Sequence, residues 1–233
     1  MLFLVDELPP GDRFRLAGLR SGAARRARAH RPGQEVLLGN GRGGTARAVV
    51  TEVAGARLDL EVTGREFVPR PEPAVLVVHG VAGADRDGLA VAELTAAGAA
   101  EIAPMVPGPV ADRWQRRDPA PYWRRVARDA AERSGQVWLP RIGAVYRSVV
   151  RRFEWGATGF VLDPTATESL STVDLPTAGE LVLVVPGDPG ELAALAGAGA
   201  IPVRHDPPEP DPRTAAIAAA TALVNRRIST AGH

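Results

Sequence analysis

The stretch Ile201-Pro-Val-Arg-His-Asp-Pro-Pro-Glu-Pro-Asp-Pro-Arg-Thr-Ala-Ala-Ile217 decides the fold class of this chain. It starts as a short strand, passes through a loop and opens an Ala-rich helix that we expect over Thr214–Arg227. Strand-to-helix loops of this kind hold ligands in many α/β proteins, because the first N–H groups and the positive dipole end of the helix meet there. This loop is unusual, since its prolines offer no N–H and its acidic residues repel anions.

Upstream of that loop, apolar strands alternate with helices. Continuous apolar runs such as Val75–Val78 are typical of strands buried on both faces of a parallel sheet. The alternation predicts an α/β domain with crossover helices on both faces of the sheet. The further strands that we expect are Glu101–Val106, Gly159–Leu162 and Glu180–Val185, and the further helices are Asp87–Ala97, Pro121–Arg133 and Glu191–Ala196.

Residues 1–70 have a different pattern, in which short apolar or alternating segments are separated by glycine-containing turns. The period of two is that of half-buried strands and predicts a small β-barrel. A short helix is expected over Ser21–His30, and the proline-rich Pro69–Pro73 is expected to form a stiff linker. The chain therefore divides into a domain of residues 1–70 and a domain of residues 73–233. The expected barrel strands are Phe3–Val5, Glu35–Leu38, Ala46–Val53 and Arg57–Val62.

The composition excludes several classes of protein. Basic and acidic residues number 28 and 27, so the net charge of +1 gives no strong overall field toward nucleic acid or membrane. The chain has no cysteine, which excludes disulfides and thiolate chemistry, and its four histidines form no close pair, so we expect no metal site. No apolar run reaches the roughly 20 residues of a transmembrane helix, and we expect a cytoplasmic protein without membrane contact.

Motifs along nearly the whole chain match one family in the same order. They include Phe3-Leu-Val-Asp6, Arg31-Pro-Gly-Gln-Glu-Val36, Asn40-Gly-Arg-Gly-Gly44, Glu101-Ile-Ala-Pro104, Arg128-Asp-Ala-Ala-Glu132 and Leu181-Val-Leu-Val-Val185. Through them the chain resembles the RsmE family, the 16S ribosomal RNA uridine-N3 methyltransferases of the SPOUT class. The resemblance implies an α/β trefoil-knot (SPOUT) domain after a small PUA-like β-barrel for RNA or substrate. It also implies a homodimer and the cofactor S-adenosylmethionine (SAM).

The resemblance further implies a site made by the loops that follow the strands of the α/β domain. The cofactor-binding positions carried over in this way are Leu162, Asp163, Pro186, Gly187, Asp188, Gly190, Asp206 and Thr214. The catalytic residues stay unknown, and the candidates are His79, Arg86, His205 and Arg213. Each histidine could act as a general base or could be an ordinary hydrogen-bonded side chain. No metal is implied.

Several of these positions depart from the family together. Pro186-Gly-Asp-Pro-Gly-Glu191 replaces a loop that normally reads Gly-Pro-Glu-Gly-Gly, and Pro208 and Asp211 stand where the next loop normally has arginines. Uridine N3 attacks a methyl group only after losing its proton, so lost cations near the base disfavour that reaction. We therefore expect a divergent member that no longer methylates ribosomal RNA and whose pocket serves a small-molecule tailoring reaction of secondary metabolism, with or without SAM.

Two alternatives remain open from the sequence. One is a working SAM-dependent 16S rRNA uridine-N3 methyltransferase, and the other is a non-catalytic RNA-binding or dimeric interaction protein. Clustered arginines support RNA contact, because phosphates bind such clusters, although a solvated arginine face would give the same pattern. The candidate RNA-binding residues are Arg25, Arg26, Arg28, Arg113, Arg124 and Arg128.

Overall fold

The computed structural model describes residues 1–19, 21–80, 84–106, 120–143, 146, 148–154, 158–186, 189–206 and 212–230. Its contacts divide the chain into two compact units. Unit 1 comprises Met1–Arg70 together with Ala127–Leu139, and unit 2 comprises Pro71–Val126 with Pro140–His233. Unit 1 therefore includes a segment that follows the expected linker in the sequence.

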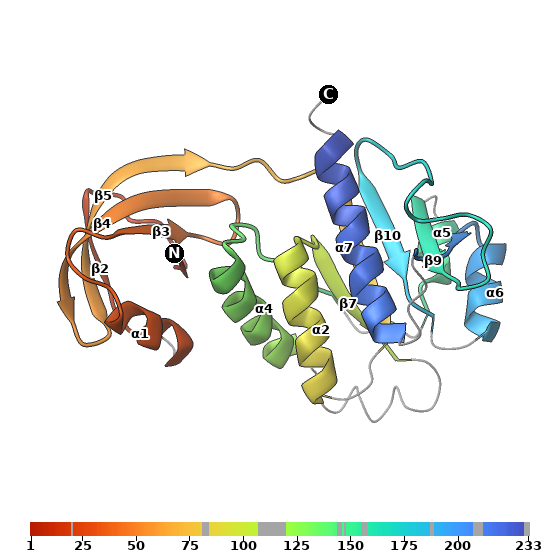
Figure 1. Ribbon diagram of the computed structural model, residues 1–233, viewed down its shortest axis with the longest axis horizontal. Coiled ribbons are helices and arrows are strands. Elements are labelled where there is room, and N and C mark those ends of the chain that lie inside the picture. The colour runs from red at the N-terminus through yellow and green to blue at the C-terminus, as the bar shows by residue number, and fades with distance from the viewer. Residues whose placement is uncertain are drawn as a thin grey trace. The chain divides into compact units, whose positions relative to one another are not determined.

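Unit 1 is built on a five-stranded, strongly curved sheet whose order is β1-β3-β4-β5-β2 (Figure 1). All neighbouring strands are antiparallel except β1 and β3, which pair in parallel. The strands are β1 (Leu2–Leu4), β2 (Arg13–Leu16), β3 (Glu35–Gly39), β4 (Gly44–Ala54) and β5 (Arg57–Phe67). In β5, buried positions alternate with less buried ones over Arg57–Val62, and helix α1 (Ser21–Arg28) closes the core with the buried Ala23 and Ala27.

The glycine-rich turn Asn40–Gly44 has a packing role in unit 1. Residues 137–139 lie along it like a short extra strand, with the Gly43 amide donating to the Val137 carbonyl at 3.2 Å and the Leu139 amide donating to the Gly41 carbonyl at 3.0 Å. Gly43 has a φ of 84°, and a Cβ there would lie 2.6 Å from the Trp138 ring. Only glycine therefore allows the indole to approach so closely.

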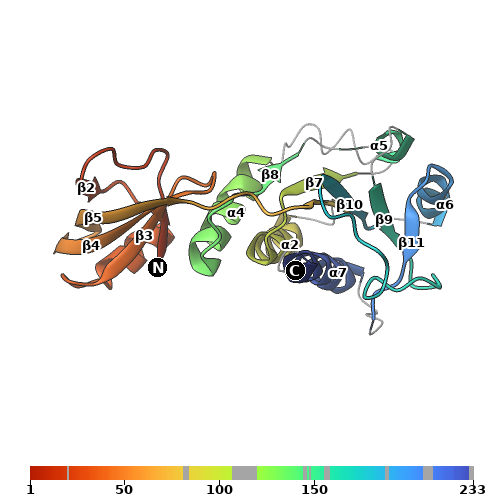
Figure 2. The ribbon, with the colours of Figure 1, turned by 90° about the horizontal axis from the view of Figure 1, so that it is seen from above.

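Unit 2 contains a six-stranded sheet in which every pair is parallel, with the order β11-β9-β10-β6-β7-β8 (Figure 2). The apolar runs of its central strands, Val75–Val78 and Leu181–Val184, are buried, as the sequence predicted. The strands are β6 (Ala74–Gly80), β7 (Glu101–Met105), β8 (Arg141–Ile142), β9 (Thr158–Leu162), β10 (Glu180–Val184) and β11 (Ile201–Val203).

Helices cover both faces of this sheet, as Figure 2 shows. α2 (Ala84–Ala97) and α7 (Pro212–Thr230) pack together on one face, while α5 (Val150–Glu154) and α6 (Pro189–Gly197) lie on the other. α4 (Ala120–Ser134) starts in unit 2, where Trp123 is fully buried, and ends in unit 1. The α/β architecture expected from the sequence is thus present.

Among the elements that the structure describes, the sequence missed three, namely β2, β8 and α5. β2 has four residues and β8 has two, and both are too short for a hydrophobic period to be recognised in the sequence. α5 has five residues and carries two arginines, which hid its apolar positions. Among the described helices, none combines the length and the apolar character needed to span a membrane.

Candidate ligand-binding edge of the parallel sheet

The carboxyl ends of β6, β9, β10 and β11 lie at one edge of the unit 2 sheet, because all four strands are parallel neighbours. Ligands of open α/β sheets bind at this edge. β10 lies between β6 and β9, with Val184 opposite Val78 on one side and Val161 on the other. The Asp163 amide donates to the Val203 carbonyl at 2.9 Å, so the chain after β9 starts beside the end of β11.

Arg204, directly after β11, holds the loop that follows β9. Its guanidinium donates to the carbonyl of Ala166 at 3.2 Å and to that of Thr167, and its Nε donates to Asp206 Oδ1 at 3.2 Å. The backbone continues the contact, since the Arg204 amide donates to the Glu168 carbonyl at 2.9 Å. A planar guanidinium presents N–H donors in several fixed directions and can reach these carbonyls and the Asp206 carboxylate together, whereas a lysine ammonium group could not.

Ser169 and Asp206 form a second link between the same two segments. The Ser169 hydroxyl donates to Asp206 Oδ2, and the Ser169 side chain is buried. This hydrogen bond is the main cause that lowers the pKa of the Asp206 carboxyl; burial opposes it, and the charge and hydrogen bond of Arg204 lower the pKa further. Asp206 is therefore a carboxylate that stays ionised at the edge of the sheet.

Arg226 of α7 holds the far end of the same loop. Its guanidinium donates to the carbonyls of Leu170 and Val173 at 2.7 and 2.8 Å. At the near end, Asp163 Oδ1 accepts from the amide and the hydroxyl of Thr165, both at 2.8 Å. The loop from Asp163 to Val173 is thus fixed by side chains from β11 and α7, and we call it the clamped loop.

The structure brings several of the predicted site residues to this edge. Leu162 ends β9 and Asp163 follows it, Pro186 follows β10, Asp206 follows β11, and His205 is half-buried beside Asp206. His79, near the end of β6, is 2% exposed. Gly190 lies in α6 and Thr214 in α7, and both are exposed. Gly187 and Asp188 lie outside the described residues, as do Pro208 and Asp211 of the proline-rich loop, while for Arg86 and Arg213 only the backbone is described.

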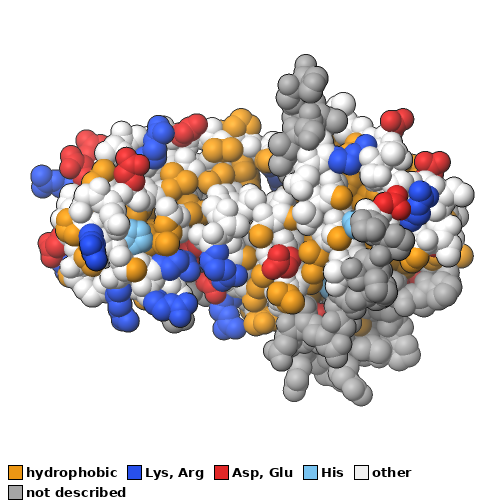
Figure 3. All heavy atoms as spheres, in the orientation of Figure 1, with side chains coloured by type: hydrophobic (Ala, Val, Ile, Leu, Met, Phe, Trp, Pro, Cys, Tyr) orange, Lys and Arg blue, Asp and Glu red, His pale blue; other side chains and the backbone are white. Residues whose placement is uncertain are grey.

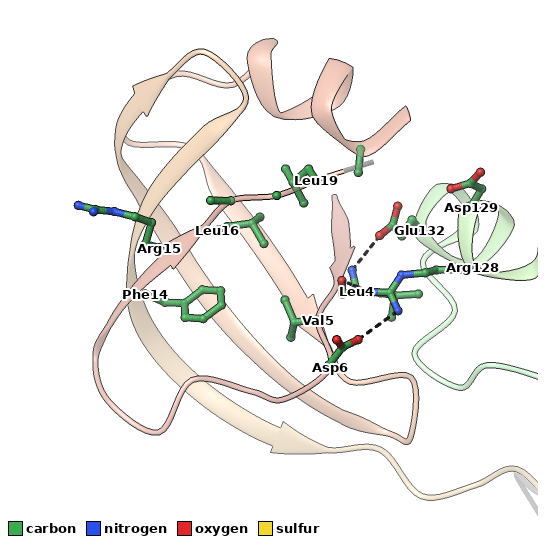
Figure 4. Close-up of a pocket in the computed structure, with 13 residues that line it drawn as sticks. Leu4, Val5, Asp6, Phe14, Arg15, Leu16, Leu19, Arg128, Asp129 and Glu132 are labelled. Carbon is green, nitrogen blue, oxygen red and sulfur yellow. Dashed lines mark hydrogen bonds and ion pairs between the residues drawn. The ribbon is translucent and has the colours of Figure 1, made fainter. Parts of the chain in front are cut away.

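The arginines predicted to bind RNA fall into two groups, and the first has structural partners within unit 1 (Figure 4). Arg128 of α4 donates to the Leu4 carbonyl and lies 3.7 Å from Asp6 Oδ1. Glu132, one turn further along α4, accepts from the Leu4 amide at 3.0 Å and from the guanidinium of Arg26 in α1. Arg128 and Glu132 thus satisfy the edge of β1 where no strand pairs with it, and both line a cavity of about 300 Å³.

The second group is exposed. Arg25 and Arg28 lie on the outer face of α1, opposite the buried Ala23 and Ala27, and Arg124 is exposed near the start of α4. Figure 3 shows basic side chains gathered over α1. Arg113 lies outside the described residues. A solvated arginine is available to a phosphate, whereas Arg26 and Arg128 are already bound to protein groups.

Sequence reasoning missed the residues that hold the clamped loop and the β1 edge. Ser169, Arg226 and Glu132 had no assigned role, because nothing in a local pattern shows which carbonyl or amide a distant side chain will meet. Arg204 was counted only as the end of a strand. The sequence showed that Glu132 stands one helical turn after Arg128, but not that its carboxylate is buried.

The fold and this edge define a class, a β domain followed by a parallel α/β domain of the SPOUT type. No family model matches the chain. A crystal structure of ribosomal RNA small subunit methyltransferase E from Neisseria gonorrhoeae, bound to S-adenosyl methionine, superposes with a TM-score of 0.73 at 18% identity, covering 97% of each chain. This likeness shows that the two chains share a fold.

Sequence comparison identifies the family itself. The chain is 34% identical over 245 aligned positions to ribosomal RNA small subunit methyltransferase E from Mycobacterium bovis and from Mycobacterium tuberculosis, covering 96% of this chain and 90% of each relative. The chain belongs to the ribosomal RNA small subunit methyltransferase E family.

This relationship corrects one expectation. The prediction that the pocket has been reused for a small-molecule tailoring reaction is wrong, because the similarity extends over 96% of the chain and nothing in the relatives indicates secondary metabolism. The prediction relied on the altered loop Pro186–Glu191, on the arginines replaced by Pro208 and Asp211, and on the prolines of the loop after Arg204. It left out the strand ends and the clamped loop, which form much of the edge independently of those prolines.

Proposed function

We propose that this protein is a SAM-dependent methyltransferase of small subunit ribosomal RNA and that it methylates N3 of a uridine. The observation that carries the proposal is the full-length relationship to proteins named as ribosomal RNA small subunit methyltransferase E. The fold supports it, since a relative with the same two-part architecture binds S-adenosyl methionine.

The residues at the sheet edge fit SAM in their chemistry. SAM carries a positively charged sulfur and an ammonium group, and Asp206 supplies a carboxylate whose pKa is lowered by the Ser169 hydroxyl. The buried Leu162 and Val185 provide apolar surface at the ends of β9 and β10. We propose that Leu162, Asp163, Pro186 and Asp206 hold the cofactor. When bound, SAM supplies an electrophilic methyl group.

The chain's own task is to bind the uridine and remove the N3 proton. His79 and His205 are the described imidazoles at this edge, and His205 is the more exposed of the two. A positioned general base contributes roughly 10²–10⁴-fold to a rate. We therefore expect substitution of the histidine that accepts the proton to lower kcat by about a hundredfold while the affinity for SAM stays unchanged.

Transfer of a labelled methyl group from SAM to small subunit rRNA tests the proposal. We expect label in the RNA, and digestion to nucleosides should place it in N3-methyluridine. Purified folded protein that transfers no label to naked rRNA or to assembled small subunits would contradict the proposal.

The homodimer implied by the family resemblance remains part of the proposal. Light scattering of the purified chain should give twice the monomer mass of 24.5 kDa. A monomer at micromolar concentration would remove this part and leave the reaction itself in place.

A further inference from the structure

One surface of unit 1, remote in the sequence from the arginine cluster of α1, combines an exposed aromatic ring with cations. Phe67, the last residue of β5, has 63% of its surface exposed, and the adjoining Val68 has 36%. Figure 3 shows hydrophobic side chains gathered over this end of β5. The exposed apolar area is small, since it comes from one ring and one short side chain.

The Phe67 ring is held in place from behind. Trp138 contacts it edge to face, with ring centroids 6.1 Å apart and planes at 81°. The indole is itself fixed, because its Nε1 donates to the Val68 carbonyl at 2.9 Å and its ring packs on Gly43. The guanidinium carbon of Arg70 lies 5.7 Å from the centre of the Trp138 ring. We call Phe67, Arg70 and Trp138 the aromatic platform.

We propose that the aromatic platform binds an unpaired base of the RNA substrate by stacking on the Phe67 ring. Unpaired bases are recognised in this way, on aromatic rings and guanidinium planes. Arg70 and the exposed Arg42, which follows Gly41 in the neighbouring turn, supply positive charge for the flanking phosphates. A stable protein partner would need on the order of 1,000 Å² of interface, far more than one exposed ring and a valine provide.

The proposal rests on the proposed function for the identity of the nucleic acid, namely ribosomal RNA. It adds a contact that the cofactor edge does not explain, because the platform lies in unit 1 and the edge lies in unit 2. It also gives a role to the Asn40–Gly44 turn, since the turn receives Trp138 and so positions Phe67.

The test measures binding of a fluorescently labelled single-stranded RNA octamer by the full-length protein and its Phe67→Ala variant. A matched abasic octamer keeps the phosphates and removes the bases. We expect Phe67→Ala to weaken binding of the base-containing octamer roughly tenfold and to leave binding of the abasic octamer unchanged. Ile201→Ala, which shortens a 40% exposed apolar side chain in unit 2, is the control and should change neither.

Equal affinities of wild type and Phe67→Ala for the base-containing octamer would overturn the proposal, as would an equal loss for both octamers. A change in oligomeric state without a change in RNA affinity would show a protein interface and would also overturn it. Thermal melting checks that the variants are folded. Methyl transfer by the wild type is read separately, so base-dependent RNA binding without methyl transfer would reject the proposed function and keep the platform.

Discussion

Two carboxylates, one in each unit, are held by arginine and by a neutral donor, yet they differ in exposure. Glu132 in unit 1 is 5% exposed and binds Arg26 and the Leu4 amide. Asp206 in unit 2 is exposed and binds Arg204 and the Ser169 hydroxyl. The buried carboxylate satisfies the edge of a strand, whereas the exposed one lies at the edge of a sheet where ligands bind.

The difference shows that charge in this sequence has two separate uses. Some arginines of α1 and α4 bind protein groups and stabilise the fold, as Arg26 and Arg128 do. Others that look alike in the sequence, Arg25 and Arg28, are exposed to solvent. Burial and partners, which depend on tertiary packing, decide which use applies to each residue.

The largest effect is expected at the buried carboxylate. Glu132→Ala leaves Arg26 without its counter-charge and the Leu4 amide without its acceptor, and should lower the free energy of unfolding by about 3–5 kcal/mol. Urea unfolding followed by circular dichroism measures this. Glu93→Ala removes an exposed carboxylate from α2 and is the control, expected to change the free energy by less than about 0.5 kcal/mol. Similar losses of unfolding free energy in Glu132→Ala and Glu93→Ala would show that the buried Glu132 contributes no more to stability than an exposed carboxylate.

A smaller effect is expected at the clamped loop. Arg204→Lys keeps the charge but cannot span the carbonyls of Ala166 and Thr167 together with Asp206, so the loop should loosen. We expect affinity for SAM, measured by calorimetry, to fall about tenfold, which corresponds to about 1.4 kcal/mol. Arg13→Lys makes the same change at an exposed position of β2 and should leave affinity unchanged. Unchanged affinity in both would separate the clamped loop from cofactor binding.

The pH dependence of stability tests the contribution of the hydrogen bond between Ser169 and Asp206. The pKa of Asp206 is lowered by the Ser169 hydroxyl, so its stabilising contribution is present above the ordinary range for aspartate and is lost as the pH falls through the lowered pKa. Ser169→Ala should therefore move this loss to higher pH, as thermal melting between neutral and acidic pH can show. Identical melting profiles for wild type and Ser169→Ala would contradict the assigned cause.

The smallest effect on stability is expected on the outer face of α1. Replacing Arg25 and Arg28 by glutamine should change the free energy of unfolding by less than about 0.5 kcal/mol, because both side chains are exposed. If they bind phosphates, the slope of log affinity for RNA against log salt should fall by about one for each arginine. An unchanged slope would show that these arginines form a solvated face.

Much of the fold was predictable from the sequence because hydrophobic period and length act locally. Strands β6 and β10 contain the apolar runs Val75–Val78 and Leu181–Val184, and the helix expected over Thr214–Arg227 lies within α7. The candidate site was predictable only in outline. The end of β9 at Leu162 and the position of Asp206 in the loop after β11 follow from the alternation. The pairing of Ser169 with Asp206, 37 residues away, depends on strand order. The error about function came from weighing the altered residues of the site loops above the similarity of the whole chain.

The assignment of this protein as the uridine-N3 methyltransferase is best tested in cells that lack its gene. Mass spectrometry of nucleosides from their small subunit rRNA should show loss of N3-methyluridine, and the wild-type gene should restore it. Full N3-methyluridine in the deletion strain would contradict the assignment of this protein as the methyltransferase.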